Sequence, residues 1–185
     1  MRGPSKVIVL DPDARAGRQV QLGFAREGVP VAAAPVTGVS AADLAGAGVV
    51  VVGGGLDQIR AAKQALADAK LDAAIVFAGR GIARTDAVAA GADEVLLGPA
   101  YLRDVVTVGR LMLDVPASHR AHLVGSLGEL TGVLTLVRAL AATGRSATLT
   151  LIRGLRRGEI RFWLGEVTSA QVGLIHNQTA LHQLT

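Results

Sequence analysis

The chain of 185 residues contains no cysteine, few aromatic residues and no long apolar run. Without cysteine, disulfides, thiol nucleophiles and cysteine-ligated metals are excluded. Aromatic residues make up 3% of the sequence, which is too few for a platform that stacks nucleic-acid bases. No apolar run approaches the ~20 residues that span a membrane, and the apolar run near the N-terminus is too short for a signal peptide. We therefore expect a cytoplasmic protein with no membrane insertion and no nucleic-acid partner.

Lysine is absent after Lys70, and the charge is unevenly placed. Residues 1–117 hold equal numbers of basic and acidic side chains, whereas residues 118–185 carry a net charge of +4 and all four histidines. Such an asymmetry indicates two domains, and it makes an acidic partner for the second domain conceivable.

Residues 49–52 are four consecutive valines with glycines on both sides. A short β-branched run of this kind is typical of a strand buried on both faces, in the centre of a parallel sheet. In such sheets ligands and chemistry lie at the carboxyl ends of the strands. Here that end carries Gly53, Gly54 and Gly55 and no functional side chain.

Strand and helix patterns alternate through residues 1–115, which predicts a doubly wound α/β domain around a five-stranded parallel sheet. Asp13 can cap the first helix, and Ser40 with Asp43 resembles a shortened capping box that opens a brief helix ended by Gly46. Strands are expected over residues 6–11, 29–35, 49–52, 73–78 and 94–97, and the other helices over 14–27, 56–71, 85–90 and 101–113, of which 85–90 is short.

The pattern is lost over residues 116–123, which we interpret as a linker. Residues 124–185 then predict a smaller α+β domain with an antiparallel meander. We expect a helix over 131–142, strands over 147–153, 159–164 and 167–172, and a helix that begins at 179. The pattern of the second domain stops within this last helix, so we expect the natural protein to continue.

Three motifs in the first domain resemble the receiver domain of bacterial two-component response regulators. They are Leu-Asp-Pro-Asp at 10–13, Ala-Gly-Ala-Asp-Glu-Val-Leu at 90–96 and Leu-Gly-Pro at 97–99. The resemblance implies a flavodoxin-like (CheY-like) fold. It also implies a phosphoacceptor after the third strand, and Gly53 occupies that position. Ala78 stands where the family has a hydroxyl residue, and Gly98 where it has a lysine.

Acidic residues remain elsewhere in the sequence. Asp11 and Asp13 follow the first strand, but Pro12 replaces one of the paired acids that would hold magnesium in the family. Two carboxylates alone supply too few ligands for a typical cation site, so we expect helix capping rather than a metal. Asp57 lies four residues beyond the phosphoacceptor position, a displacement on the order of 6 Å even in a helix.

The second domain resembles the PATAN-type domain that is often joined to receivers in bacterial signalling proteins. The motifs are Gly-Ser-Leu-Gly-Glu at 125–129, Thr-Gly at 143–144, Gly-Glu-Ile-Arg-Phe at 158–162, Leu-Gly-Glu-Val at 164–167 and Thr-Ala-Leu-His-Gln-Leu at 179–184. The resemblance implies a protein-interaction module in motility, polarity or signalling, with no catalytic activity.

We therefore expect a non-enzymatic signalling scaffold, a pseudo-receiver that acts through protein contacts without phosphorylation and needs no cofactor or metal. One alternative is a receiver that binds a nucleotide or anion at the loop of Gly53, Gly54 and Gly55. Another is an active phosphoacceptor at Asp11 or Asp57.

Two surfaces are candidates for contact with protein partners, a second copy of the chain among them. The first corresponds to the face that receivers use for dimerisation and output, and it comprises Tyr101, Arg103, Val106 and Arg110. The second comprises Arg156, Arg157 and Trp163. The arginines suit either an acidic partner or a solvated hairpin, and Trp163 either anchors an interface or lies under the domain's own helix.

Overall fold

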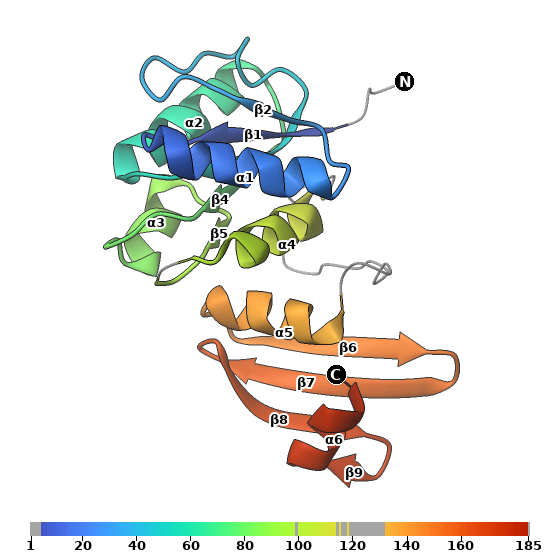
Figure 1. The fold of residues 1–185 in the computed structure, drawn as a ribbon. Helices are drawn as coiled ribbons and strands as arrows, with labels where there is room; N and C mark the ends of the chain where they lie inside the picture. Colours follow the sequence, from blue (N-terminus) through green and yellow to red (C-terminus); the bar gives the residue numbers. More distant parts are fainter. Residues whose placement is uncertain (1–4, 99, 114, 116–117, 119–131, 185) are drawn as a thin grey trace. The chain divides into compact units, whose positions relative to one another are not determined.

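The computed structural model describes residues 5–98, 100–113, 115, 118 and 132–184. The chain divides into two compact units, Met1–Gly125 and Ser126–Thr185 (Figure 1). The linker predicted over 116–123 lies outside the described residues except for Ser118, so its bounds stay a prediction. No helix in the described part of the chain has the length and apolar character needed to cross a membrane.

The N-terminal unit is built on a parallel sheet with the strand order β2-β1-β3-β4-β5. This is the order of the flavodoxin-like doubly wound fold, so the predicted receiver-like fold class is confirmed. The strands are β1 (Lys6–Leu10), β2 (Val31–Ala33), β3 (Ala47–Val52), β4 (Ala74–Phe77) and β5 (Glu94–Val95).

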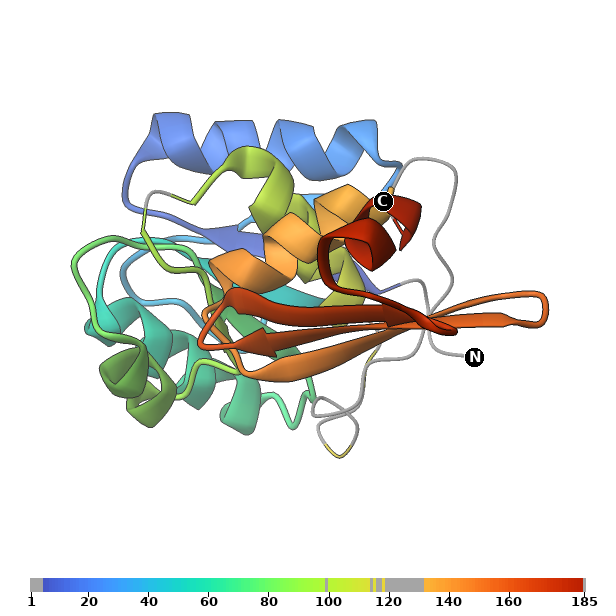
Figure 2. The same ribbon diagram turned by 90° about the horizontal axis from the view of Figure 1, so that it is seen from below.

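The burial of the strands follows their position in the sheet. The four valines of β3 are at most 2% exposed, because β1 and β4 pair with this strand on either side and helices cover both faces of the sheet (Figure 2). The short strand β2 lies at the edge of the sheet, where the prolines that flank it cost no ladder hydrogen bond. The predicted central and edge positions are both confirmed.

Two pairs of helices cover the two faces of this sheet. Figure 2 shows α1 (Ala14–Arg26) and α4 (Leu102–Met112) on one side, with α2 (Leu56–Asp68) and α3 (Arg84–Ala90) on the other. Gly91 ends α3 in the left-handed conformation, as a C-terminal glycine commonly does.

The helix predicted after Ser40 does not form, and residues 41–46 are turns. The capping interaction itself is present, because the Ser40 backbone amide and hydroxyl both donate to the Asp43 carboxylate, at 2.9 and 2.6 Å. Gly46 follows with a φ of +76°, and β3 begins at the next residue. Too few residues remain for a second helical turn, so one of the five expected helices is replaced by a loop.

Helices α1 and α4 pack closely through two glycines. A Cβ on Gly23 would lie 2.8 Å from the Val106 side chain, and one on Gly109 would lie 2.5 Å from the ring of Phe24. Val106 is only 7% exposed. Its predicted place on a partner surface is therefore wrong, because α4 buries one stripe against the sheet and a second stripe against α1.

The C-terminal unit is an antiparallel meander with the strand order β6-β7-β8-β9 and two helices on one face (Figure 2). The predicted α+β class is confirmed, but β7 begins three residues earlier than expected, and β9 was not predicted. The elements are α5 (Val133–Ala142), β6 (Ala147–Arg153), β7 (Arg156–Trp163), β8 (Glu166–Val172), β9 (Ile175–His176) and α6 (Asn177–Leu184).

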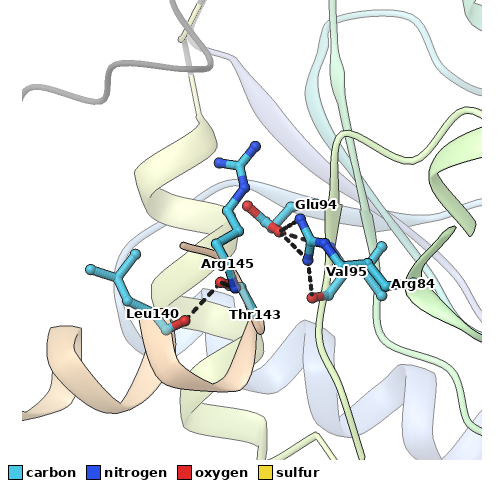
Figure 3. Close-up of polar contacts among 6 residues, drawn as sticks. All are labelled: Arg84, Glu94, Val95, Leu140, Thr143 and Arg145. Atoms are coloured by element: carbon cyan, nitrogen blue, oxygen red, sulfur yellow. Dashed lines mark hydrogen bonds and ion pairs between the residues drawn. The ribbon is translucent and has the colours of Figure 1, made fainter. Parts of the chain in front are cut away.

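The core of this unit lies between the sheet and its helices. Ile160, Phe162 and Ala170 point from the strands toward Val137 and Ala180 on the helices, and all five are buried. At the end of α5, the Thr143 hydroxyl donates to the Leu140 carbonyl at 2.7 Å and closes the turn into β6 (Figure 3). This matches the predicted Thr-Gly turn.

Candidate functional site

Three of the predicted site residues, Asp11, Gly53 and Ala78, lie next to one another at the carboxyl edge of the parallel sheet. Leu10 pairs with Val52, and Val52 pairs with Phe77. The next residues of these three strands are Asp11, Gly53 and Ala78, so they stand side by side at the end of the sheet where doubly wound proteins place their chemistry. Gly98 follows β5 in an exposed loop, with open space where a side chain would start.

The carboxylate of Asp11 fills the space that a side chain at position 53 would need. A Cβ built on Gly53 would lie 2.4 Å from Asp11 Oδ2 and 2.5 Å from Asp11 Cγ. The backbone at Gly53 is also fixed, since its amide donates to the Leu10 carbonyl at 2.8 Å. A phosphoacceptor side chain therefore has no room at this position while Asp11 keeps its conformation.

The orientation of Asp11 comes from the local turn before α1. Its Oδ1 accepts the Asp13 backbone amide at 2.9 Å. Burial raises the pKa of the Asp11 carboxyl, the hydrogen bond from the Asp13 amide opposes that rise, and the nearby charge of Asp13 adds to it. Asp11 is thus a partly buried acid whose charged form is held less favourably than in water.

Asp13 has the capping role predicted for it. Its Oδ1 accepts the backbone amides of Arg15 and Ala16, at 2.9 and 3.1 Å, and so caps the N-terminus of α1. Among the described residues, no three histidine, aspartate or glutamate side chains form a group that could hold a metal ion. Asp11 and Asp13 are a neighbouring pair engaged mainly with the backbone of their own turn.

The glycines of the loop after β3 allow close approach between neighbouring loops. Gly54 has a φ of +80°, and a Cβ on it would lie 2.9 Å from the ring of Pro12. A Cβ on Gly79, in the loop after β4, would lie 2.8 Å from the Gly54 carbonyl oxygen. Three loops therefore meet at this edge with little space between their backbones.

Two of the three loop amides already have partners inside the protein. Besides the bond from Gly53 to β1, the Gly55 amide donates to Gln58 Oε1 at 2.9 Å, at the start of α2. A phosphate-binding loop needs such amides to point at its ligand. The arrangement therefore supports a packing role for these glycines more than a nucleotide or anion site.

Asp57 lies away from the sheet edge. It stands in the first turn of α2, its side chain is 89% exposed, and it pairs with Arg60 at 3.0 Å. An acid at a helix N-terminus that is open to solvent has the usual role of helix stabilisation.

A buried ion pair that was not predicted connects α3 to β5 (Figure 3). Both terminal nitrogens of Arg84 donate to Glu94 Oε1 at 3.1 Å, and the Glu94 side chain is only 4% exposed. The Val95 amide donates to the same oxygen at 3.1 Å, and the Val95 carbonyl accepts from Arg84 at 3.4 Å. An acid inside the apolar run of β5 was the signal in the sequence that such a partner should exist.

The first candidate surface keeps three of its four members. Tyr101 is 64% exposed at the start of α4, and Arg103 is exposed in its first turn. Arg110 pairs with Glu27, the residue that follows α1, at 2.5 Å. Val106 is buried between the helices, as described above, so the surface is narrower than the sequence predicted.

The second candidate surface is divided between the two faces of the antiparallel sheet. Arg157 and Trp163 lie on the face that the helices leave uncovered, whereas Arg156 is in phase with the buried residues Gly158 and Ile160 of the other face. Arg156 and Arg157 are exposed within β7, not in the turn before it, and Arg157 pairs with Glu159 at 2.8 Å. Trp163 is 64% exposed. The alternative that Trp163 lies under a helix of its own domain is therefore wrong.

The histidines form no part of either surface. His176 and His182 are exposed, whereas His119 and His122 lie outside the described residues.

Comparison with known proteins gives structural neighbours only. No protein-family model and no curated protein matches the chain. An orphan response regulator of H. pylori is similar at 15% identity and a TM-score of 0.46, over 61% of this chain and 99% of that one. A response regulator receiver protein from Pseudomonas putida is similar at 17% identity and a TM-score of 0.46, over 60% of this chain and 98% of that one. A response regulator from Thermotoga maritima is similar at 18% identity and a TM-score of 0.44, over 61% of this chain and 100% of that one.

Proposed function

We propose that this chain is a non-enzymatic signalling protein whose N-terminal unit is a pseudo-receiver that works without phosphoryl transfer. The observation that carries the proposal is the Asp11 carboxylate, which occupies the place of a side chain on Gly53. The strand order supports the receiver comparison, and the filled edge supports the loss of its chemistry.

Phosphoryl transfer depends almost entirely on positioned charge around the transferred group. At the sheet edge the nucleophile position is Gly53, the hydroxyl position is Ala78, and the lysine position is Gly98. Asp11 is the acid that remains at this edge, and its pKa is raised by burial. A single acid without a hydroxyl, an ammonium group or a metal-ligand set has little with which to stabilise a phosphoryl transition state.

The proposal is tested by incubating the intact chain with acetyl phosphate and Mg²⁺ and measuring its mass. We expect no phosphoryl adduct, and no change in amide chemical shifts with beryllofluoride. An adduct that disappears in Asp11→Asn or in Asp57→Asn would identify an active phosphoacceptor and overturn the proposal. An authentic receiver treated in parallel controls for the reagents.

The ion pair between Arg84 and Glu94 supports a fixed output face. It connects the first turn of α3 to β5, and it also holds the backbone of Val95. Because this largely buried ion pair holds α3 and β5 together, the face beside it should keep one conformation. A single conformation suits a scaffold that binds its partner constitutively. We therefore assign protein contact to the exposed residues beside it, Tyr101 and Arg103.

This contact is tested by affinity capture with the intact protein. Tyr101→Ala and Arg103→Glu should reduce the recovery of partners, whereas Arg15→Glu, an equal charge change on the exposed part of α1, should not. Equal recovery with all three variants would remove this surface from the proposal. A second copy of the chain is one possible partner, and light scattering of the same variants identifies it.

For the C-terminal unit we propose a PATAN-type interaction module, in a cytoplasmic pathway such as motility or cell polarity. The motif at 125–129 lies outside the described residues. The support comes from the order of helix, meander and helix, and from the Phe162 and Ala170 positions, which are buried in the core. Affinity capture with the intact chain and with Trp163→Ala tests whether the uncovered sheet face contributes to binding.

A further inference from the structure

Both two-residue turns at one end of the antiparallel sheet present a fully exposed leucine. Gly154 and Leu155 join β6 to β7, and Gly173 and Leu174 join β8 to β9. Leu155 is 107% exposed and Leu174 is 96% exposed, relative to the free residue. Because Gly158 pairs with Val172, the two turns lie at the same end of the sheet (Figure 1).

The geometry of these turns does not require leucine. In each turn the glycine has a positive φ, +60° at Gly154 and +56° at Gly173, and the leucine after it does not. Glycine first is the requirement of a type II′ hairpin turn, whose second position accepts polar residues readily. Neither leucine is buried in its own unit, so both are available to a surface outside the protein.

Basic and apolar side chains lie beside Leu155 on the two strands that its turn joins. Ile152 is 74% exposed on β6, and Arg157 is exposed on β7. Arg153 and Arg156 pair with each other in the strand register and flank Leu155. We call this group the Gly-Leu tip, and its members are Ile152, Arg153, Leu155, Arg156, Arg157 and Leu174.

We propose that the Gly-Leu tip binds the surface of a membrane that contains anionic lipids. Aliphatic side chains on protruding turns can enter the boundary between headgroups and acyl chains, while arginines beside them remain among the anionic headgroups. A bilayer accepts such a convex tip without a shaped groove. A protein partner would need a pocket for each of two leucines on separate turns, so the lipid surface fits the observations better.

This inference goes beyond the proposed function and does not depend on it. The pseudo-receiver proposal concerns the edge of the parallel sheet and fails if the chain is phosphorylated. The present inference concerns the other unit and fails by its own binding experiment. The two results are therefore distinguishable.

The experiment is cosedimentation of the intact chain with large vesicles. Vesicles of phosphatidylcholine with phosphatidylserine should bind the chain, and vesicles of phosphatidylcholine alone should bind it much less. Raising the salt concentration should weaken the binding, because the arginines contribute by charge.

Two double variants separate the contribution of the leucines to vesicle binding from that of the arginines. Leu155→Asn with Leu174→Asn should lower partitioning at least about tenfold, because two aliphatic side chains no longer leave water. Arg153→Gln with Arg156→Gln should lower it roughly thirtyfold, at about fivefold for each charge. Since all four side chains are exposed, both variants should keep the fold, which circular dichroism verifies.

Matched controls come from the same chain. Leu164→Asn changes a leucine that is 68% exposed in the turn at the opposite end of β7. Arg15→Gln with Arg18→Gln removes two exposed charges from α1. Both controls should bind vesicles like the unchanged chain.

Three results would overturn the inference. The first is no binding to phosphatidylserine vesicles at low salt. The second is an equal loss of binding in the control variants, which would mean attraction by net charge only. The third is a tip variant that binds vesicles normally but loses a captured protein, which would assign the tip to a protein partner.

Discussion

The contact between Gly53 and Asp11 predicts a large coupling between two substitutions. In Gly53→Ala the new methyl group would lie 2.4 Å from Asp11 Oδ2, so the carboxylate must turn away. The turn then loses the hydrogen bond from the Asp13 amide. Such a bond to a charged group contributes about 1.5–3 kcal/mol, and the lower entropy of the unfolded alanine chain offsets about 0.4–1 kcal/mol. We expect a net destabilisation of ~1–2 kcal/mol.

The same substitution should be harmless once Asp11 is shortened. In Asp11→Ala the three nearest atoms to the new methyl group, all in the carboxyl group, are gone. Because φ at position 53 is not in the left-handed region, alanine there should stabilise the protein by about 0.5 kcal/mol through the unfolded state. The coupling energy between the two sites is then ~2 kcal/mol, well above the few tenths expected for independent sites.

Native-state hydrogen exchange of the intact chain measures this coupling within the N-terminal unit. The amides of β3 exchange through the most costly openings of that unit, since the strand is buried in the centre of the sheet. A coupling of ~2 kcal/mol corresponds to about a thirtyfold difference in the exchange rate of β3. Asp11→Asn serves as the control, because it keeps the shape and removes the charge. If Gly53→Ala has the same effect beside aspartate, asparagine and alanine, the argument that Asp11 fills the site is refuted.

Three further predictions concern the same unit. Gly53→Asp should destabilise it and still gain no phosphoryl group from acetyl phosphate in mass spectrometry, because the restored acid meets Asp11. Since the pKa of Asp11 is raised in the fold, the protein should lose stability as the pH rises from about 4 through the folded pKa. Asp11→Asn should lack that loss, as urea unfolding at a series of pH values will determine. Glu94→Gln should cost about 2 kcal/mol by removing the negative charge that pairs with the partly buried Arg84 cation. Glu27→Gln, at a more exposed pair, should cost less than ~1 kcal/mol in the same unfolding assay.

The sheet of the N-terminal unit was predictable because its signal is local. Continuous β-branched runs such as residues 49–52 are typical of strands that are buried on both faces of a parallel sheet, and the glycines around them mark the ends. The edge position of β2 was predictable from its prolines. In the C-terminal unit the alternation of β6 predicted a half-buried strand, and burial alternates along β7 in the same way.

The errors lie where a local pattern meets a neighbour that is distant in sequence. Ser40 and Asp43 form the hydrogen bonds of a capping box, but the strand that begins at Ala47 leaves no length for a helix. Val106 lies off the single apolar stripe expected for α4, yet it is buried because glycines let α1 approach closely. A sequence pattern that assigns one apolar stripe to a helix does not identify a second face that packs against another helix.

The candidate site was predictable in identity but not in geometry. The sequence placed glycine and alanine at the positions of the phosphoacceptor and the hydroxyl, and the register brings those residues together with Asp11. It gave no indication that the carboxylate points at Gly53, since that direction depends on a hydrogen bond within the turn before α1. The partner of Glu94 was likewise hidden, ten residues away at the start of a helix.

The contacts at the filled edge also oppose the introduction of an acid at position 53. A carboxylate at position 53 requires Asp11 to move, and Gly54 and Pro12 are in close contact in the neighbouring loop. Gly79, in the loop after the next strand, lies close to the Gly54 carbonyl, so the loop of Gly54 has little room to move toward it. The absence of a side chain at Gly53, Gly54 and Gly79 is therefore coupled to the close packing, because a neighbouring group occupies the space at each of the three positions. Close contacts between three loops occupy this edge of the sheet, so a substitution that adds a side chain to any of these glycines must displace a neighbouring group.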